Sequence, residues 1–258
     1  MTNSCKPEFL DSPAYGGVEQ NQIAYKRMVE NDPKSNPGLI WCGGLKSDMN
    51  GTKASALHGW AQTHELAFIR FDYFGHGAST GRFRDGTISR WAQDTVQVID
   101  ELTSGPQILI GSSMGGWTAL LASLARPERI AALVLLAPAP DFTEKLMWAS
   151  FGDDIRRTIM KEGIYYEPSD YDEPYEISRE LILDGRKNLL LDGPININVP
   201  VRIIQGQQDT SVPWQYALKL TDALKCQNVV VHLIKDGDHS LSRPQDIARL
   251  QEIISDLL

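Results

Sequence analysis

One serine, one aspartate and one histidine of this chain stand where they could form a nucleophile, its general base and an orienting acid. Ser113 is the central residue of Gly111-Ser112-Ser113-Met114-Gly115, a G-x-S-x-G pattern. The apolar run Gln107–Ile110 precedes the pattern and a helix-forming run from Gly116 follows it. A sharp strand–turn–helix junction of this kind would expose the serine hydroxyl for attack on a carbonyl carbon. The structural alternative is a glycine-rich turn that only starts a helix.

A serine hydroxyl needs a base within hydrogen-bonding reach, and that base needs an acid to orient it. His239 follows the apolar run Val229–Ile234, and Asp209 follows Val201–Gly206, so both are expected where strands end. The chain order Ser113, Asp209, His239 is typical of serine hydrolases built on parallel sheets. Asp236 and Asp238 are alternative acids, but a neighbour in the same loop rarely reaches Nδ1 of its own histidine.

The tetrahedral intermediate of such a reaction needs two N–H donors for its oxyanion. We expect one from Met114, directly after the nucleophile. The other is expected from the loop Cys42-Gly43-Gly44-Leu45, with Gly44 as the first choice and Leu45 as the reserve. A plain tight turn at the two glycines is the structural reading and is compatible with this role. Cys42 is expected to be a small buried residue.

These residues require a scaffold of strands and helices, and the chain predicts an α/β fold. Short apolar runs alternate with helix-like segments, which indicates a mostly parallel sheet covered on both faces. The expected strands are Gly38–Cys42, Leu66–Asp72, Gln107–Gly111, Ala132–Ala137, Val201–Gly206 and Val229–Ile234, with Ile23–Val29 as an antiparallel edge strand. The expected helices are Thr52–His64, Ile88–Leu102, Gly116–Ala125, Trp214–Leu224 and Pro244–Leu257, the last with proline in its first turn.

The alternation is interrupted once, by residues 141–199, which show helix-like stretches and no clear strand. Structureless loops of this length are rare in compact domains. We therefore predict a helical cap, or lid, at 141–199, inserted into a core formed by 1–140 and 200–258. The expected helices of the cap are Thr143–Phe151, Asp154–Glu162 and Ile177–Lys187. The candidates for substrate contact are Met147 and Trp148, together with Leu45 of the core. Docking of the cap is the simpler role for Met147 and Trp148.

Composition excludes several classes of function. The 258 residues carry a formal net charge of −8, without a basic stripe, which argues against nucleic-acid binding. Segment 141–199 holds 13 acidic and 7 basic residues. This excess could be a solvated surface, or it could disfavour anionic substrates. No apolar run approaches the roughly 18 residues of a membrane span. Met1–Glu8 lacks a signal-peptide pattern, so we expect a cytoplasmic protein, or a mitochondrial matrix protein if the chain is a processed form.

Cysteine and histidine spacing predicts no metal site and no disulfide. The three cysteines form no C-x-x-C pair, and the five histidines form no H-E-x-x-H or H-x-H pair. We therefore expect free thiols and a reaction that needs neither a metal nor another cofactor. The oligomeric state does not follow from the sequence.

The motifs together resemble the α/β-hydrolase superfamily over nearly the whole chain. Asp72-Tyr-Phe-Gly-His76-Gly-Ala-Ser79 is similar to the D-x-x-G-x-G-x-S segment of that family, which implies that Asp72 and His76 are scaffold residues. The stretches 49–54, 69–73, 105–117, 125–128 and 212–214 resemble the mitochondrial palmitoyl-protein thioesterases of the α/β-hydrolase-domain group, which are also described as acyl-glucuronide esterases.

The sequence therefore predicts a serine hydrolase with an α/β-hydrolase fold, acting on a small ester or thioester or on an acylated protein. Acyl transfer from Ser113 would be assisted by His239 and Asp209. A carbon–carbon hydrolase, a peptidase or a perhydrolase could use the same residues. A non-catalytic ligand-binding protein is the alternative from another class, and it would not require all three residues.

Overall fold

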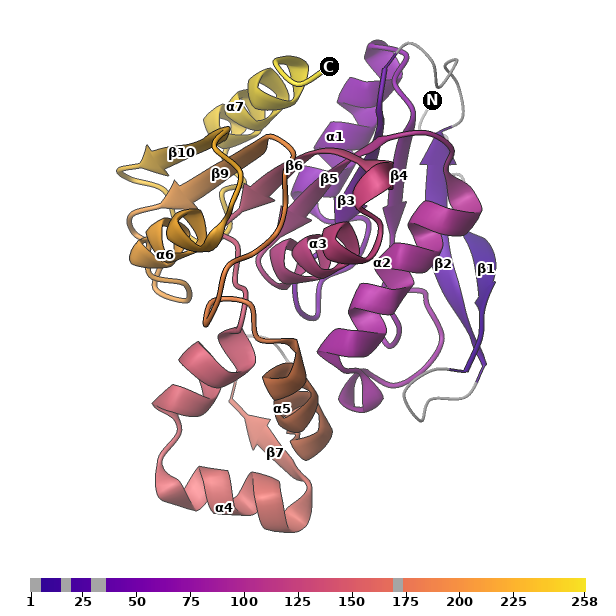
Figure 1. The fold of residues 1–258 in the computed structure, drawn as a ribbon. Helices are drawn as coiled ribbons and strands as arrows, with labels where there is room; N and C mark the ends of the chain where they lie inside the picture. Colours follow the sequence, from indigo (N-terminus) through magenta and orange to yellow (C-terminus); the bar gives the residue numbers. More distant parts are fainter. Residues whose placement is uncertain (1–5, 15–19, 29–35, 169–173) are drawn as a thin grey trace.

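The computed structural model describes residues 6–14, 20–28, 36–168 and 174–258 of the chain. Within these residues, one sheet has eight strands in the order β1-β2-β4-β3-β5-β6-β9-β10 (Figure 1). The strands of this sheet are β1 (Glu8–Ser12), β2 (Asn21–Met28), β3 (Gly38–Cys42), β4 (Phe68–Phe71), β5 (Gln107–Ser112), β6 (Ile130–Leu136), β9 (Val201–Gly206) and β10 (Val229–Ile234). Neighbours from β4 to β10 are parallel, which confirms the predicted mostly parallel sheet.

The antiparallel end of the sheet differs from the prediction. Ile23–Val29 was expected to be the edge strand, but β2 lies between β1 and β4 and pairs antiparallel with both. The edge is β1, whose sequence Glu-Phe-Leu-Asp-Ser is too short and too polar to stand out as a strand. Val29 lies outside the described residues.

Alternate residues of the strands pack into two different apolar clusters, one on each face of the sheet. In β3, Leu39 and Trp41 belong to one cluster and Ile40 and Cys42 to the other. This alternation follows from the two-residue period of a strand. The first face is covered by α1 (Thr52–Thr63) and α7 (Pro244–Ser255), and the second by α2 (Ile88–Leu102), α3 (Met114–Ala125) and α6 (Gln215–Ala223) (Figure 1). Both faces of the central strands are thus buried, as their continuous apolar sequences predict.

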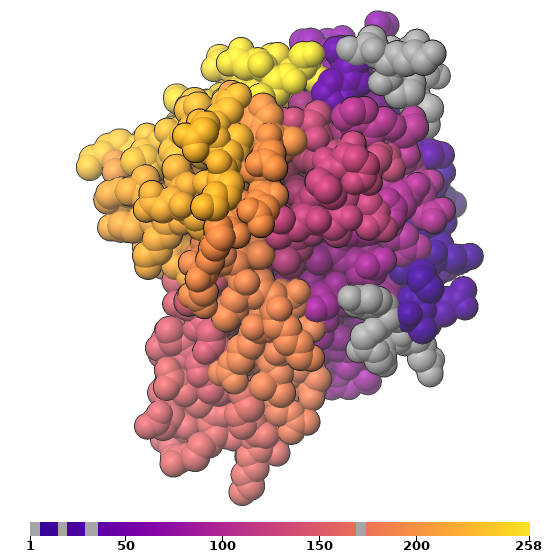
Figure 2. Space-filling view, viewed as in Figure 1, coloured from indigo at the N-terminus to yellow at the C-terminus, as the bar shows by residue number. Residues whose placement is uncertain are grey.

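Residues 143–168 and 174–188 project from the body of the molecule as a lobe (Figure 2), whereas 189–199 return along the core, where Ile195 and Ile197 join its apolar cluster. The lobe contains a π-helical segment (Thr143–Trp148), α4 (Asp153–Glu162), β7 (Ile164–Glu167), β8 (Tyr175–Ser178) and α5 (Arg179–Gly185). β7 and β8 pair as an antiparallel hairpin. The prediction of helices alone was therefore wrong here, because each strand has only four residues and mixes tyrosine with glutamate. The predicted helix Ile177–Lys187 begins instead at Arg179, after the end of β8.

The two ends of this lobe are joined through Asp141. Its backbone has a φ of 61°, and its carboxylate accepts hydrogen bonds from the N–H groups of Leu190 and Leu191, at 2.8 and 2.9 Å. A second contact links the lobe to α2, because the carboxylate of Asp184 accepts from the N–H and the hydroxyl of Ser89, both at 2.8 Å. The lobe is therefore attached to the core at its base and along α5.

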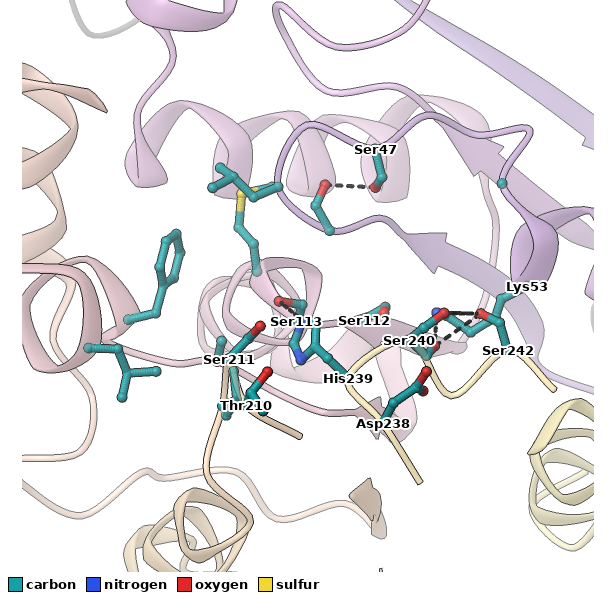
Figure 3. A pocket seen from close by; sticks show the side chains of 18 of the residues that line it. Ser47, Lys53, Ser112, Ser113, Thr210, Ser211, Asp238, His239, Ser240 and Ser242 are labelled. Carbon is teal, nitrogen blue, oxygen red and sulfur yellow. Dashed lines mark hydrogen bonds between the residues drawn. The ribbon is translucent and has the colours of Figure 1, made fainter. Parts of the chain in front are cut away.

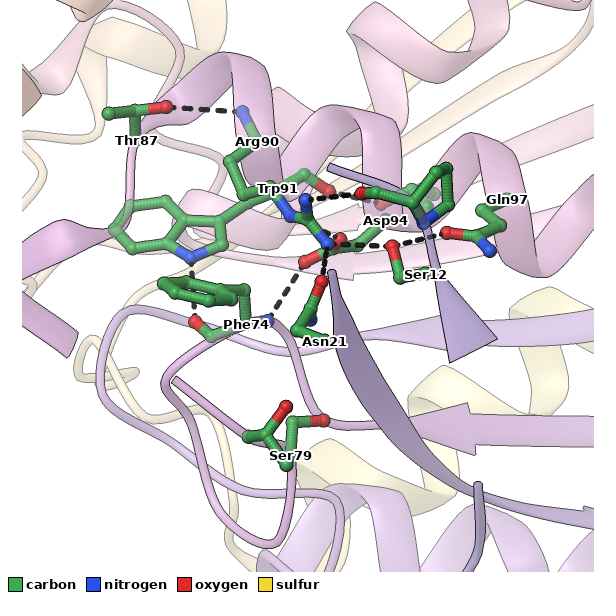
Figure 4. Close-up of polar contacts among 12 residues, drawn as sticks. Ser12, Asn21, Phe74, Ser79, Thr87, Arg90, Trp91, Asp94 and Gln97 are labelled. Carbon is green, nitrogen blue, oxygen red and sulfur yellow. Dashed lines mark hydrogen bonds and ion pairs between the residues drawn. The ribbon is translucent and has the colours of Figure 1, made fainter. Parts of the chain in front are cut away.

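A buried polar network attaches the antiparallel end of the sheet to α2 (Figure 4). The guanidinium of Arg90 is 1% exposed and lies 2.9 Å from the Asp94 carboxylate. It also donates to the hydroxyl of Ser12 at 2.6 Å and to the side chain of Asn21. Asp94 accepts in turn from the N–H of Phe74, at 2.8 Å. A buried cation of this kind is tolerated because the Asp94 carboxylate neutralises it and Ser12 and Asn21 accept hydrogen bonds from it. Through Asp94 and Phe74 the network fixes the segment that follows β4.

Candidate active site

Ser113 lies on the sharp turn between β5 and α3. Its φ of 55° and ψ of −118° are rarely adopted by residues with a side chain, so the turn stores backbone strain. The glycines on either side make this turn possible. A Cβ on Gly111 would come within 2.5 Å of the carbonyl oxygen of Gly115, and one on Gly115 within 2.1 Å of the carbonyl oxygen of Cys42. The G-x-S-x-G spacing is therefore required by packing.

The structure brings Ser113 together with the two other residues that the sequence singled out. The Nε2 atom of His239 lies 3.1 Å from the Oγ of Ser113, and its Nδ1 lies 2.7 Å from the Oδ2 of Asp209. Asp209 follows β9 and His239 follows β10, so all three residues lie beyond the carboxyl ends of parallel strands, where sites form in such sheets. Figure 3 shows the imidazole of His239 directed toward Ser113.

Asp209 is held by several donors besides the histidine. Its side chain is fully buried, and it accepts from the N–H groups of Ser211 and Val212 at 2.9 and 2.8 Å and from the amide of Gln205 at 3.0 Å. Burial tends to raise the pKa of this carboxyl, but the hydrogen bond from His239 and the backbone donors outweigh it and lower the pKa below its ordinary value. Asp209 therefore remains a carboxylate that can face an imidazolium.

The two alternative acids are engaged elsewhere. The carboxylate of Asp236 forms an ion pair with Arg243 at 2.7 Å. The Oδ1 of Asp238 accepts from the N–H of Leu241 at 2.9 Å, within the loop that carries His239. Neither of them is the partner of the Nδ1 of His239.

The loop after β3 lies against the serine, as its glycines suggested. The Cα of Gly44 packs so closely that a Cβ there would lie 3.6 Å from the Cβ of Ser113. Gly44, Leu45 and Met114 all line the cavity above the serine. Among the hydrogen bonds of the described residues, none uses the backbone N–H of these three residues as donor. These N–H groups are thus available to a ligand.

Asp72 and His76 support this loop and do not face the serine. The carboxylate of Asp72 accepts from the N–H of Met49 at 2.6 Å and from that of Ala78 at 2.8 Å; burial raises its pKa to about 6. His76 is 3% exposed, and its Nε2 accepts from the N–H of Lys46 at 3.0 Å. Cys42 is fully buried, as expected, and burial raises the pKa of its thiol to about 12.

A cavity of about 1070 Å³ opens above Ser113 and has walls of two kinds. Its more apolar wall comes from the β3 loop, the base of the lobe and the Asp209 loop, which contribute Leu45, Ala139, Phe142, Leu146, Met147 and Val212. The same segments also contribute polar side chains, among them Lys145, Glu167 and Ser211. Its polar wall comes from the start of α1 and the loop that carries His239, and includes Ser47, Thr52, Lys53, Asp238, Ser240 and Ser242. Figure 3 shows Lys53, Ser240 and Ser242 grouped together beside His239.

Two of the three predicted substrate contacts, Leu45 and Met147, line this cavity, and the third does not. The guanidinium groups of Arg156 and Arg186 lie 5.5 and 4.7 Å from the centroid of the Trp148 ring. Its role as a substrate contact stays a prediction, which this packing does not favour. In a helical segment, successive residues point in different directions, so Met147 can face the cavity while Trp148 packs within the lobe.

Lys53 is a cavity residue that sequence reasoning missed. Its ammonium donates to the carbonyl of Ser240 and to the hydroxyl of Ser242, the latter at 3.3 Å. Desolvation lowers its pKa to about 8, although Asp238 and Asp246 oppose that shift. No sequence signal marks it, because a lysine in the first turn of a predicted helix reads as an exposed residue.

No group of three or more histidine, cysteine, aspartate or glutamate side chains in residues 6–14, 20–28, 36–168 and 174–258 is arranged to hold a metal ion. In the same part of the chain, no helix combines the length and the apolar character needed to cross a bilayer.

Comparison with known proteins identifies the family of the chain. Residues 56–250 match the model of the alpha/beta hydrolase family. The chain is 36% identical to human palmitoyl-protein thioesterase ABHD10, mitochondrial, over 238 residues, which cover 92% of this chain and 76% of the human protein. A crystal structure of a putative hydrolase from Agrobacterium vitis S4 superposes with a TM-score of 0.91 at 41% identity, covering 97% of this chain and 98% of that one. The mouse alpha/beta hydrolase domain-containing protein 10 superposes with a TM-score of 0.87 at 34% identity, covering 98% of each chain. On this evidence the chain belongs to the alpha/beta hydrolase family and is a hydrolase.

Proposed function

We propose that the protein is a serine hydrolase that cleaves carboxylic esters or thioesters through an acyl-enzyme on Ser113. The observation that carries the proposal is the continuous contact from Ser113 through His239 to Asp209, at 3.1 and 2.7 Å. A serine hydroxyl is a weak nucleophile on its own, and a base at this distance accepts its proton as it attacks. The buried carboxylate of Asp209 holds the imidazole in the tautomer that leaves Nε2 free to accept.

The steps of the reaction follow from this arrangement. The Oγ of Ser113 bonds to the carbonyl carbon while its proton moves to the Nε2 of His239. The N–H of Met114 and that of Gly44 or Leu45 would stabilise the oxyanion that forms. The tetrahedral intermediate then collapses, and the leaving alcohol or thiol takes the proton from His239. Water repeats the sequence, with His239 as its base, and releases the acid and free Ser113.

The two walls of the cavity suggest how a substrate lies in it. The leaving group must accept its proton from His239, so it departs on the side of the imidazole, where the polar wall with Lys53, Ser240 and Ser242 lies. The acyl chain would then occupy the apolar wall that includes Phe142 and Met147. We therefore infer a preference for apolar acyl groups on a polar leaving group, with segment 141–199 acting as a lid over the acyl chain.

The similarity to palmitoyl-protein thioesterases supports a more specific candidate substrate, the thioester between a fatty acid and a protein cysteine. Such a substrate has the division that the cavity walls suggest, since the acyl chain is apolar and the peptide is polar. Those relatives carry a mitochondrial address in their name, whereas the cytoplasmic address expected from the sequence stays a prediction.

Substitution of Ser113 tests the proposed function directly. We expect Ser113→Ala to abolish both labelling by a fluorophosphonate probe and hydrolysis of p-nitrophenyl esters, because the Ser113 hydroxyl is the nucleophile hydrogen-bonded to the Nε2 of His239 in the described part of the chain. Ser150→Ala is the matched control, since this exposed serine lies at the rim of the same cavity, donates to the carbonyl of Met147 and should leave labelling intact. Undiminished labelling of Ser113→Ala would overturn the assignment. A panel of matched acyl esters and thioesters then ranks the two substrate classes.

A further inference from the structure

The loop that follows β3 leaves the sheet and cannot be held by strand pairing, yet it must keep N–H groups aimed at the serine. Part of the support is internal, because the carbonyl of Gly44 accepts from the N–H of Ser47 at 3.2 Å and from its hydroxyl at 2.8 Å. The far end is held by Asp72, which accepts from the N–H of Met49. Between these two points the backbone turns at Lys46, whose φ is 55°.

A side chain from another segment holds the backbone at Lys46. The N–H of Lys46 donates to the Nε2 of His76, at 3.0 Å. This hydrogen bond fixes the peptide plane between Leu45 and Lys46, which directly follows the two peptide units that carry the N–H groups of Gly44 and Leu45. A positive φ at a residue with a long side chain is unfavourable, so a contact of this kind is needed to maintain it.

His76 is itself held rigidly and in a defined tautomer. Its Nδ1 lies 3.1 Å from the carbonyl oxygen of Phe74, and its ring lies edge-on to Phe83 and Trp91, with both centroids 5.2 Å away. Because Nε2 accepts a hydrogen bond from Lys46, the neutral ring must carry its proton on Nδ1, which then donates to Phe74. Burial also lowers the pKa of His76 to about 4, which keeps the acceptor free at neutral pH.

We propose that His76 is a positioning residue for the oxyanion-binding loop: its Nε2 fixes the Lys46 peptide and thereby the direction of the N–H groups that precede it. His76 is not among the residues that line the cavity above Ser113. Its effect is therefore expected on stabilisation of the oxyanion in the transition state and not on substrate affinity. The inference rests on the proposed function, since it assigns a task within that reaction.

The test compares two substitutions that differ in one acceptor. His76→Leu fills the same space without an acceptor, whereas His76→Gln keeps an acceptor as many bonds from Cα as Nε2. We expect His76→Leu to lower kcat by about 10- to 100-fold with KM within about 2-fold, and His76→Gln to recover most of the loss. Inhibition by an acyl trifluoromethyl ketone, which forms a tetrahedral oxyanion on the serine, should weaken by the same factor as kcat/KM. Variant concentrations are set from the folded fraction measured by circular dichroism.

The outcomes separate this inference from the proposed function. If the wild type hydrolyses esters and Ser113→Ala does not, the function holds whatever the His76 variants do. Equal loss in the leucine and glutamine variants, or a change in KM alone, would overturn the positioning role. If neither variant folds, the wild type still decides it: a long-range ¹H–¹⁵N spectrum at neutral pH should show His76 protonated on Nδ1, and a proton on Nε2 would refute the hydrogen bond from Lys46.

Discussion

At the scale of single residues, the site depends on the carboxylate of Asp209, which accepts hydrogen bonds from three other donors besides His239. Asp209 accepts from His239, from the N–H groups of Ser211 and Val212, and from Gln205. Each of these bonds favours the ionised form, and together they hold one oxygen toward the imidazole. The neighbouring Asp238 lies one residue from His239 in the chain but is turned toward Leu241. Proximity in sequence is thus a poor guide to which acid serves the base.

Replacing each of these two aspartates separates their roles. We expect Asp209→Asn to lower kcat by about 10³- to 10⁴-fold, because an amide can hold the imidazole in the wrong tautomer and cannot stabilise its charged form. Asp238→Asn should lower kcat by less than about 10-fold, because it weakens only a loop hydrogen bond. Steady-state kinetics on one p-nitrophenyl ester measure both. Comparable losses in the two variants would mean that Asp209 is not the orienting acid.

At the scale of helices and strands, the sequence predicted the strands with mostly apolar runs and missed the short, polar ones. β3 and β9 are central strands and have the predicted bounds. β10 also has the predicted bounds although it is an edge strand with Val230 and Leu233 exposed, because its sequence is apolar except for His232. β1, β7 and β8 are short and have one face or both in contact with water, so their sequences carry no continuous apolar signal. For the same reason the order Ser113, Asp209, His239 was predictable from strand ends, whereas the contact from Lys46 to His76 was not.

The attachment of the lobe at Asp141 leads to a prediction at this scale. Asp141→Asn keeps a residue type that tolerates positive φ but places an NH₂ group against one of the N–H groups of Leu190 and Leu191. We expect the free energy of unfolding to fall by about 2 kcal/mol and the Tm by about 4–8 °C. Hydrogen exchange should accelerate at Leu190 and Leu191 and across the lobe, but not in β5 or β6.

Asp192→Asn is the matched control for the attachment at Asp141. Its carboxylate is 61% exposed and pairs with Lys145 at the surface, so its loss should change the Tm by less than about 2 °C. A Tm for Asp141→Asn equal to that of the control would show that the hydrogen bonds from Leu190 and Leu191 to Asp141 contribute nothing to the attachment of the lobe.

At the scale of the whole molecule, the charge is distributed unevenly. Segment 141–199 has 13 acidic and 7 basic residues, so it carries −6 of the total −8, and the core is nearly balanced. This segment also supplies part of the cavity wall, including Glu167 and Lys145. We expect the field of this charge to reach substrates that approach the cavity. Such a field acts on the rate of approach of charged substrates and leaves neutral ones unaffected.

Salt dependence of the reaction therefore tests the role of this charge. The butanoyl esters of 4-hydroxybenzamide and 4-hydroxybenzoate differ chiefly in one negative charge. Raising the ionic strength from about 0.01 M to about 0.15 M shortens the screening length from about 30 Å to about 8 Å. We expect kcat/KM of the anionic ester to rise by about 2- to 5-fold over this range, while that of the neutral ester stays constant.

A variant with less negative charge on the lobe provides a second test. Asp153 and Asp154 in α4 are about nine-tenths exposed, and the double variant Asp153→Asn, Asp154→Asn should reduce the rise. Equal salt dependence of the two esters would mean that the acidic side chains are only an ordinary water-exposed surface and do not act on the substrate.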